Sequence, residues 1–355
     1  MHLKLQPSGK IINVRIDEPI ARGGEGSICA IVHDEERAAK IYHRETDAQR
    51  KRMPERERKI LCMMNVESSK KNAHEKYSLA LPSEILYDAH DETQFRGFIM
   101  QRAMNAHALS TYYKPDMRQA IATGCTYAFL FQAARHITLA IERAHEQHFV
   151  IGDLNGSNIL VNPDGDVTLV DTDSFQVIDR EQNIIYRCPV GKKEYTPPEL
   201  QRSSFSRVVR KEEHDLFSLA IILFHILMEG HHPFAGISRT SVRSTIAAHI
   251  QKGLYTFSSN FRFRVQPPLG APPIDLLPTK LQELFVRCFE IGLIDPSKRP
   301  SIREWYDTLS MCERDLVRCE IQPQHFFGNH LSMCPWCDRK KILQGIDPFP
   351  EIENI

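Results

Sequence analysis

The sequence lacks an excess of charge of either sign. Its 355 residues include 45 Lys and Arg and 45 Asp and Glu, so the formal net charge is zero with histidine neutral. Proteins whose overall field attracts nucleic acid or an anionic membrane surface carry a marked positive charge. The composition therefore predicts a protein that binds neither nucleic acid nor membrane.

A long apolar run and an apolar leader are also missing. The longest apolar stretch, Leu216 to Met228, is interrupted by Ser218 and His225 and is too short to cross a bilayer. The first ten residues, MHLKLQPSGK, contain no apolar core of a signal peptide. The nine cysteines are scattered except for a group near the C-terminus, which does not suit a disulfide framework. We expect a cytoplasmic protein with reduced thiols.

The pattern along the chain changes from strand-like to helical. A length of 355 residues suits two domains or one large two-lobed domain. Apolar periodicity and turn signals predict strands at 3–5, 11–15, 38–42, 159–161 and 167–170, and helices at 44–65 and 127–148. This order predicts an α+β protein with a strand-rich N-lobe (1–101), a helical C-lobe (102–311) and a C-terminal tail (312–355).

A glycine-rich turn precedes a strand that contains one lysine. Residues 21–28 read A-R-G-G-E-G-S-I, a G-x-G-x-x-G pattern with Ala first, and glycine lets a backbone approach phosphate closely. Taken alone, this stretch favours a plain glycine turn over a phosphate-binding loop. Lys40 lies among small and apolar residues and needs a partner if buried. Glu57 is the predicted partner and Glu55 its competitor, with a surface lysine as the alternative.

Polar residues gather around the predicted hairpin. Asp153 and Asn158 are five apart in the preceding loop, and Asp171 follows the second strand. A carboxylate and an amide oxygen that meet there can bind Mg²⁺. Turn capping is the alternative for each residue alone. The three together, in this order and spacing, favour phosphoryl transfer.

The order of these motifs resembles the protein kinase fold. Asp153 to Asn158 resembles the catalytic loop, and Asp171 resembles the aspartate of the D-F-G motif. Gly191 to Glu199 resembles the end of the activation segment, and Asp295 to Pro300 resembles a closing motif whose arginine usually pairs with Glu199. The match runs from about residue 20 to about residue 309. It implies a two-lobed kinase that transfers the γ-phosphoryl group of Mg-ATP to a Ser or Thr hydroxyl.

The resemblance implies a role for each site residue. Lys40, oriented by Glu57, would hold the α- and β-phosphates. Asn158 and Asp171 would bind Mg²⁺, and Asp153 would orient and deprotonate the acceptor hydroxyl. Phe98 to Ala103 resembles the strand and linker between the lobes, with a plain edge strand as the alternative. The residues predicted to line the nucleotide site are Gly23, Gly24, Gly26, Ile28, Ala38, Lys40, Met100, Gln101, Ala103 and Leu160.

A narrower resemblance points to one bacterial subfamily. Asp171 to Gln176, Thr196 to Leu200 and Cys334 to Cys337 resemble kinases of the tellurite-resistance-associated phosphorylation triads. That resemblance implies two partners, a von Willebrand A-domain protein and a metal-dependent protein phosphatase.

Three positions, 152, 155 and 173, depart from the kinase pattern, whereas Asp215 matches it. Gly152 replaces an arginine that usually binds a phosphorylated activation loop, which predicts activity independent of such a phosphate. Asn155 replaces a lysine that usually touches the transferring phosphate, which favours slow or absent transfer. Asp173 replaces the D-F-G glycine and is predicted as an added metal ligand or as a cap. Asp215 is predicted to cap a helix and to hold the catalytic loop.

Cysteine and histidine cluster near the end of the chain. Cys334-x-x-Cys337 supplies half of a tetrahedral zinc site, and Cys319 and His325 would complete it, as in the resembled subfamily. His330 is the alternate fourth ligand. A thioredoxin-like redox motif is the rival interpretation, but it expects a βαβ surrounding that the pattern lacks. We predict a structural Zn²⁺.

Two other functions compete with catalysis. A nucleotide-binding pseudokinase that serves as a scaffold is favoured by Asn155 and Ala21. A small-molecule phosphotransferase is disfavoured by Gly191 to Glu199 and by Asp215, which resemble the peptide-handling part of protein kinases.

Overall fold

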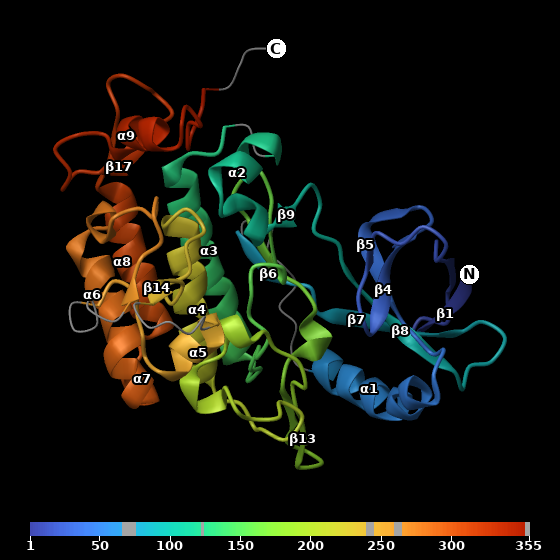
Figure 1. Ribbon diagram of the computed structural model, residues 1–355. Coiled ribbons are helices and arrows are strands. Elements are labelled where there is room, and N and C mark those ends of the chain that lie inside the picture. The colour runs from blue at the N-terminus through green and yellow to red at the C-terminus, as the bar shows by residue number, and fades with distance from the viewer. Residues whose placement is uncertain (66–75, 122–123, 239–244, 259–264, 352–355) are drawn as a thin grey trace.

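The computed structural model describes residues 1–65, 76–121, 124–238, 245–258 and 265–351 (Figure 1). A strand-rich part, formed by the first residues, lies on one side, and a larger helical part lies on the other (Figure 1). Among the described residues, no helix combines the length and the apolar character that a bilayer crossing requires.

The strand-rich part is built on one antiparallel sheet, in the order β2-β1-β7-β8-β5-β4-β3. Alternating side chains such as Leu3 and Leu5 are buried, as period-two patterning requires. Helix α1 (Asp47–Asn65) packs against β7 and β8 and contains Pro54. The strand bounds are β1 His2–Gln6, β2 Ile11–Asn13, β3 Ala21–Arg22, β4 Gly26–Ile31, β5 Asp34–Tyr42, β7 Pro82–Asp88 and β8 Phe95–Gln101.

A second sheet joins the two parts. Its order is β6-β11-β10-β9, and β6 (Tyr77–Leu79) pairs in parallel with β11 (Val167–Leu169). Strands β10 (Ile159–Val161) and β11 form the predicted hairpin, and β9 (His107–Ala108) completes the sheet. The loop of residues 151–158 enters β10, and residues 171–199, which we call the connecting segment, leave β11. The loop therefore ends, and the connecting segment begins, at the same end of the β10–β11 hairpin, where Ile159 pairs with Leu169.

Helix α4 (Glu212–Leu227) forms the centre of the helical part, because every residue from Phe217 to Leu227 is buried. The apolar run seen in the sequence is thus a core helix. Thr126 caps the neighbouring helix α3 (Tyr127–Glu146) by accepting from the Phe129 amide. The remaining helices are α2 Pro115–Ile121, α5 Ile246–Gln251, α6 Thr279–Val286, α7 Gly292–Ile294 and α8 Ile302–Arg314.

The C-terminal elements dock onto the ends of α3 and α8 (Figure 1). Trp336 is fully buried, with its ring 4.6 Å from Tyr127 and 4.8 Å from Phe349 between centroids. The tail therefore shares the core of the helical part. Its elements are β16 Leu316–Arg318, β17 Phe326–Gly328 and α9 Pro335–Ile342, and the other short strands are β12 Val177–Asp179, β13 Ile184–Tyr186, β14 Ile237–Ser238 and β15 Val265–Gln266.

Candidate active site and a second cluster of cysteine and histidine

Lys40 of β5 meets two carboxylates from the start of the connecting segment. Its Nζ atom lies 2.6 Å from Oδ1 of Asp171 and 2.5 Å from Oδ1 of Asp173. Asp171 lies two residues after the end of β11 and adopts a left-handed conformation with φ 58°, which aspartate tolerates better than most residues. The structure thus brings the strand lysine and the hairpin-end carboxylate into direct contact.

The environment favours the charged forms of Lys40 and Asp173. Burial opposes the charge of Lys40, but the carboxylates of Asp173 and Asp171 outweigh burial and raise its pKa. Burial acts against the charge of Asp173 as well, yet the Lys40 ammonium group lowers the pKa of Asp173 overall. Burial raises the pKa of Asp171 despite the attraction of Lys40. Lys40 and Asp173 therefore form the stronger ion pair.

Glu57 does not lie at Lys40, so the predicted pairing is wrong. Glu57 in α1 instead accepts a hydrogen bond from the hydroxyl of Tyr87. The residue of α1 that points at the site is Lys59, which is buried and whose Nζ donates to the backbone oxygen of Asp173 at 2.6 Å. The counter-ion of Lys40 comes from the connecting segment and not from the helix.

Asp173, predicted as a metal ligand or a cap, binds the side chains of Lys40 and Tyr42. Its Oδ2 accepts from the hydroxyl of Tyr42 at 2.7 Å, while Oδ1 faces Lys40. Both carboxylate oxygens are therefore engaged by side chains of β5. The predicted capping role is wrong, because these bonds come from side chains and not from backbone amides.

The 151–158 loop orients Asn158 through Asp153. The Nδ2 group of Asn158 donates to the backbone oxygen of Asp153 at 2.9 Å and to its Oδ2 at 3.3 Å. Because the amide nitrogen is held this way, the Oδ1 oxygen of Asn158 is the atom that can bind a cation. The Val170 amide donates to the Asn158 carbonyl at 3.0 Å, which ties the loop to the end of β11 beside Asp171.

Asp215 holds the backbone of the same loop. Its Oδ2 accepts from the Ile151 amide and its Oδ1 from the Gly152 amide, both at 2.8 Å. The predicted contact with the loop is confirmed. The predicted capping role is wrong, because Lys211 occupies the N-cap position of α4.

Gly152 leaves no room for the arginine that the family pattern expects. Its φ is +73°, and a Cβ atom there would lie 2.9 Å from Cβ of Cys188. The guanidinium group of buried Arg210 donates to the carbonyls of Gly152 and Val190. Arg210 therefore links the loop directly to the connecting segment without a phosphate between them.

The glycine-rich turn joins β3 and β4. A Cβ atom at Gly26 would lie 2.6 Å from the Ile41 carbonyl, so the close approach of β4 to β5 requires glycine there. The Gly23 amide donates to the Gly26 carbonyl at 2.9 Å and closes the turn. Around Gly24 a Cβ atom would meet nothing within 4 Å. The turn is therefore open at Gly24.

The other residues predicted at the nucleotide occupy neighbouring strands. In the sheet register, Ile28 lies opposite Lys40, and Ala38 lies opposite Met100. Met100 is buried near the end of β8, and the exposed Gln101 ends that strand. Ala103 follows β8 in the link to the helical part, and Leu160 lies in β10 opposite Ala108.

The closing motif pairs as predicted. Arg299, whose side chain is fully buried, donates to both carboxylate oxygens of Glu199, at 2.9 and 3.0 Å. This two-fold bond anchors the end of the connecting segment to the helical part.

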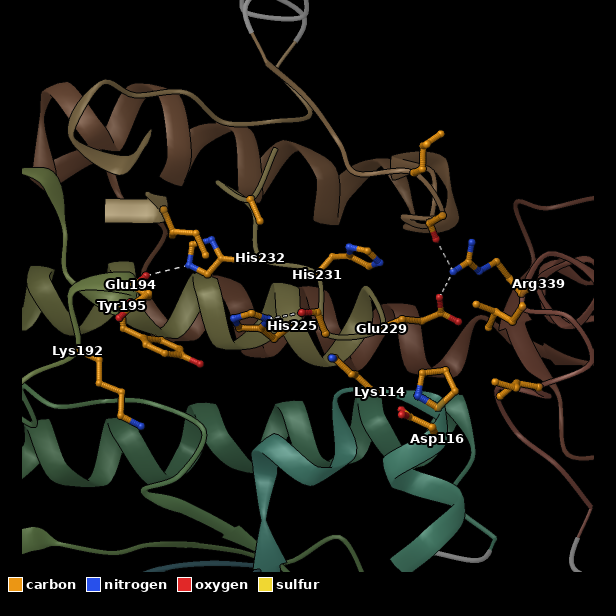
Figure 2. A pocket seen from close by; sticks show the side chains of 18 residues that line it. Lys114, Asp116, Lys192, Glu194, Tyr195, His225, Glu229, His231, His232 and Arg339 are labelled. Carbon is orange, nitrogen blue, oxygen red and sulfur yellow. Dashed lines mark hydrogen bonds and ion pairs between the residues drawn. The ribbon is translucent and has the colours of Figure 1, made fainter. Parts of the chain in front are cut away.

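A cavity of about 780 Å³ begins at the connecting segment and extends to the C-terminal tail. Lys192 and Arg339 lie at opposite ends of it (Figure 2). Burial lowers the pKa of His225 to about 4 and that of His232 to about 3, so both imidazoles in the cavity wall are neutral. Arg339 pairs with Glu229 at the far end.

Sequence analysis missed Lys192. Its Nζ donates to Oδ1 of Asn155 and to Oγ of Ser157, both at 2.9 Å. The signal was available in Gly191-Lys192-Lys193, at the start of the stretch that resembles the end of the activation segment.

The predicted zinc ligands gather in one place. The ligand atoms of Cys319, His325, Cys334 and Cys337 all lie within 4.8 Å of one another. Two sulfurs bound to a tetrahedral zinc lie about 3.8 Å apart, and the Cys319 and Cys337 sulfurs are separated by 3.8 Å. Nε2 of His325 lies 2.8 Å from Asp347, which leaves Nδ1 toward the sulfurs. The four donors fit Zn²⁺, whereas His330 contacts the Asp275 carbonyl outside the cluster.

Comparison with known proteins agrees with this geometry. A sequence model of the protein kinase domain matches residues 15–309. Protein kinase YegI of Escherichia coli (strain K12) is 30% identical over 339 residues, which cover 94% of this chain and 50% of that protein. A putative ribosomal protein S6 kinase alpha-1 of Caenorhabditis elegans is 29% identical over 180 residues, which cover 47% of this chain and 22% of that protein. The chain thus spans about half the length of the YegI proteins that it matches.

Proposed function

Because the chain belongs to the protein kinase family, we propose that it transfers the γ-phosphoryl group of Mg-ATP to a serine or threonine hydroxyl of a partner protein. ATP and Mg²⁺ are the reactants that this family uses in general. The proposal rests on the meeting of three separate stretches of chain: Lys40 in β5, Asn158 in the 151–158 loop, and Asp171 after β11.

Each residue has a role that its contacts support. Lys40 would hold the α- and β-phosphates, and Asn158 and Asp171 would hold Mg²⁺, which neutralises charge on the phosphates. Asp153 would orient the acceptor hydroxyl and take its proton. The adenine would lie near Ala38, Met100 and Leu160, and the backbone of residues 23–26 would cover the phosphates.

A protein acceptor fits better than a small molecule. The cavity that starts at Lys192 is large enough for a segment of polypeptide, and it lies beside the loop that contains Asp153. The pair of Glu199 and Arg299 anchors the connecting segment a few residues beyond Lys192, Glu194 and Tyr195, which line this cavity. From the resemblance of Asp171 to Gln176 and of the cysteine tail, we propose a von Willebrand A-domain protein as acceptor and a metal-dependent protein phosphatase as the opposing enzyme.

The tail would bind one structural Zn²⁺. Three sulfurs and the Nδ1 of His325 supply four donors, which fills a tetrahedral shell without water. The carboxylate of Asp347 supports His325 from the other side of the ring, as second-shell partners of metal-bound histidines do.

Labelled ATP distinguishes catalysis from scaffolding. The full chain is incubated with γ-labelled ATP and Mg²⁺, alone and with a von Willebrand A-domain protein, next to an Asp153→Ala variant. Label on protein that disappears in the variant supports the kinase. Nucleotide binding without any transfer supports the alternative of a pseudokinase scaffold, which the neutral side chain of Asn155 favours.

A further inference from the structure

The 151–158 loop has no cation where the transferring phosphate would lie. Residue 155 is a fully buried asparagine whose polar atoms are all engaged within the protein. Its Nδ2 donates to the backbone oxygen of Asp153 at 2.9 Å and to its Oδ1 at 3.0 Å, and its Oδ1 accepts from the Ser157 amide at 3.0 Å. Asn155 therefore has no hydrogen left to donate to a phosphate.

A cation reaches this place from the connecting segment. Lys192 is exposed, and its Nζ lies 2.9 Å from both Oδ1 of Asn155 and Oγ of Ser157. One asparagine side chain thus separates the ammonium group from the carboxylate of Asp153. An ammonium group has three hydrogens, and these two bonds use two of them. The third is available to a phosphate beside Asp153.

The neighbouring cations are committed elsewhere. Lys193 donates to the carbonyl of Gln201 at 2.5 Å and lies 4.6 Å from the ring centroid of Phe205. Arg210 is held by the carbonyls of Gly152 and Val190. Of these three cations, Lys192 is the one that contacts side chains of the 151–158 loop, since Arg210 reaches only its backbone at Gly152.

We propose that Lys192 is a catalytic residue that supplies, from the connecting segment, the positive charge missing at position 155. In this step the bond from the γ-phosphorus to the β-phosphate oxygen breaks and a bond to the acceptor oxygen forms. The hydroxyl proton goes to Asp153, ADP leaves, and Lys192 keeps its protons while it stabilises the charge on the moving phosphoryl group. This role rests on the proposed kinase function.

The same arrangement explains the asparagine. The Oδ1 of Asn155, fixed by the Ser157 amide, is an acceptor that steadies an ammonium group. A lysine at 155 would place a second positive charge against Lys192. The neutral asparagine at position 155 and the lysine at position 192 are therefore compatible with each other, and two lysines at these positions would not be.

The test compares single variants of two adjacent lysines with a double variant that moves the positive charge from position 192 to position 155. In the assay with γ-labelled ATP, single-turnover transfer at saturating Mg-ATP is measured for Lys192→Met, with Lys193→Met as the matched control. Loss of a preorganised cation should lower the rate of Lys192→Met roughly a hundredfold or more, whereas Lys193→Met should stay within about threefold. The double variant Asn155→Lys/Lys192→Thr returns the charge to the loop and should recover most of the rate.

A binding measurement separates contact with phosphate from support of the loop. Aluminium fluoride stands in for the transferring phosphoryl group and should tighten the binding of Mg-ADP to the unsubstituted protein. This tightening should be lost in Lys192→Met and kept in Lys193→Met, with the Kd of Mg-ADP alone unchanged. A Lys192→Met variant that keeps a third of the rate and the full tightening overturns the role of Lys192 alone. Absence of transfer by the unsubstituted chain overturns the proposed function and this role together.

Discussion

The two halves of the candidate active site differ in how they hold their charges. In the nucleotide half, Lys40 is buried against Asp173 in a direct ion pair of 2.5 Å. In the acceptor half, Asp153 is held through neutral amides, and Lys192 is exposed. Buried ion pairs contribute strongly when broken, whereas exposed charges contribute little to folding. The first half should therefore govern stability and nucleotide affinity, and the second should govern rate.

Replacement of Asp153 should have the largest effect on rate. Asp153→Asn removes the proton acceptor and should lower kcat by about 10² to 10⁴, while the Kd of Mg-ATP stays within about twofold. Single-turnover transfer and nucleotide titration measure the two quantities. A large loss of nucleotide affinity in this variant would erase the distinction between the halves.

Asp173→Asn should instead lower stability and nucleotide affinity more than it lowers the rate of transfer. Removal of one partner of a buried ion pair costs about 3 kcal/mol of unfolding free energy. Glu57→Gln is the control and should cost less than about 1 kcal/mol, because it weakens one partly buried hydrogen bond. Urea unfolding gives both values.

The magnesium dependence of Asp173→Asn tests the prediction that Asp173 is an added metal ligand. Both oxygens of Asp173 are engaged by Lys40 and Tyr42, so we expect the Mg²⁺ concentration at half-maximal activity to be unchanged. A marked rise in that concentration would instead identify Asp173 as a metal ligand.

Metal removal should affect the acceptor half and spare the nucleotide half. The tail reaches the cavity through Arg339, which pairs with Glu229. Chelation should release about one equivalent of zinc, lower the unfolding temperature by at least about 5 °C and raise the KM for the acceptor. The Kd of Mg-ATP should not change. Purified, metal-replete protein with much less than one equivalent of zinc would contradict the site.

Phosphatase treatment should have the smallest effect. Arg210 joins the carbonyls of Gly152 and Val190 directly, so the loop needs no phosphate to stay in place. Activity after treatment should remain within about twofold of the untreated protein. A large loss would show that a phosphorylated residue supports the connecting segment after all.

Spacing along the sequence predicted what lies within one element or across one turn. Strand β10 has the predicted bounds, and Arg299 meets Glu199 as expected. Spacing did not predict which side of α1 faces the site. Two residues along a helix turn the side chain by about 200°, so the choice between Glu57 and Lys59 depends on packing against β7 and β8.

Lys192 was missed for a related reason. Its partner Asn155 lies 37 residues earlier, and the two meet where Arg210 and Arg299 hold the later part of the connecting segment, at Val190 and Glu199. Sequence motifs report which residue a position has lost. Motifs do not show which side chain, distant in the sequence, lies close enough in space to supply a charge that this position lacks.

The counter-ion of Lys40, Asp173, and the cation proposed to replace the one missing at position 155, Lys192, both belong to the stretch of backbone between β11 and α4. Displacement of that stretch separates Lys40 from its counter-ion and withdraws the ammonium group from Asn155 in one movement. A ligand that displaces residues 171–199 should therefore act on both halves of the site together.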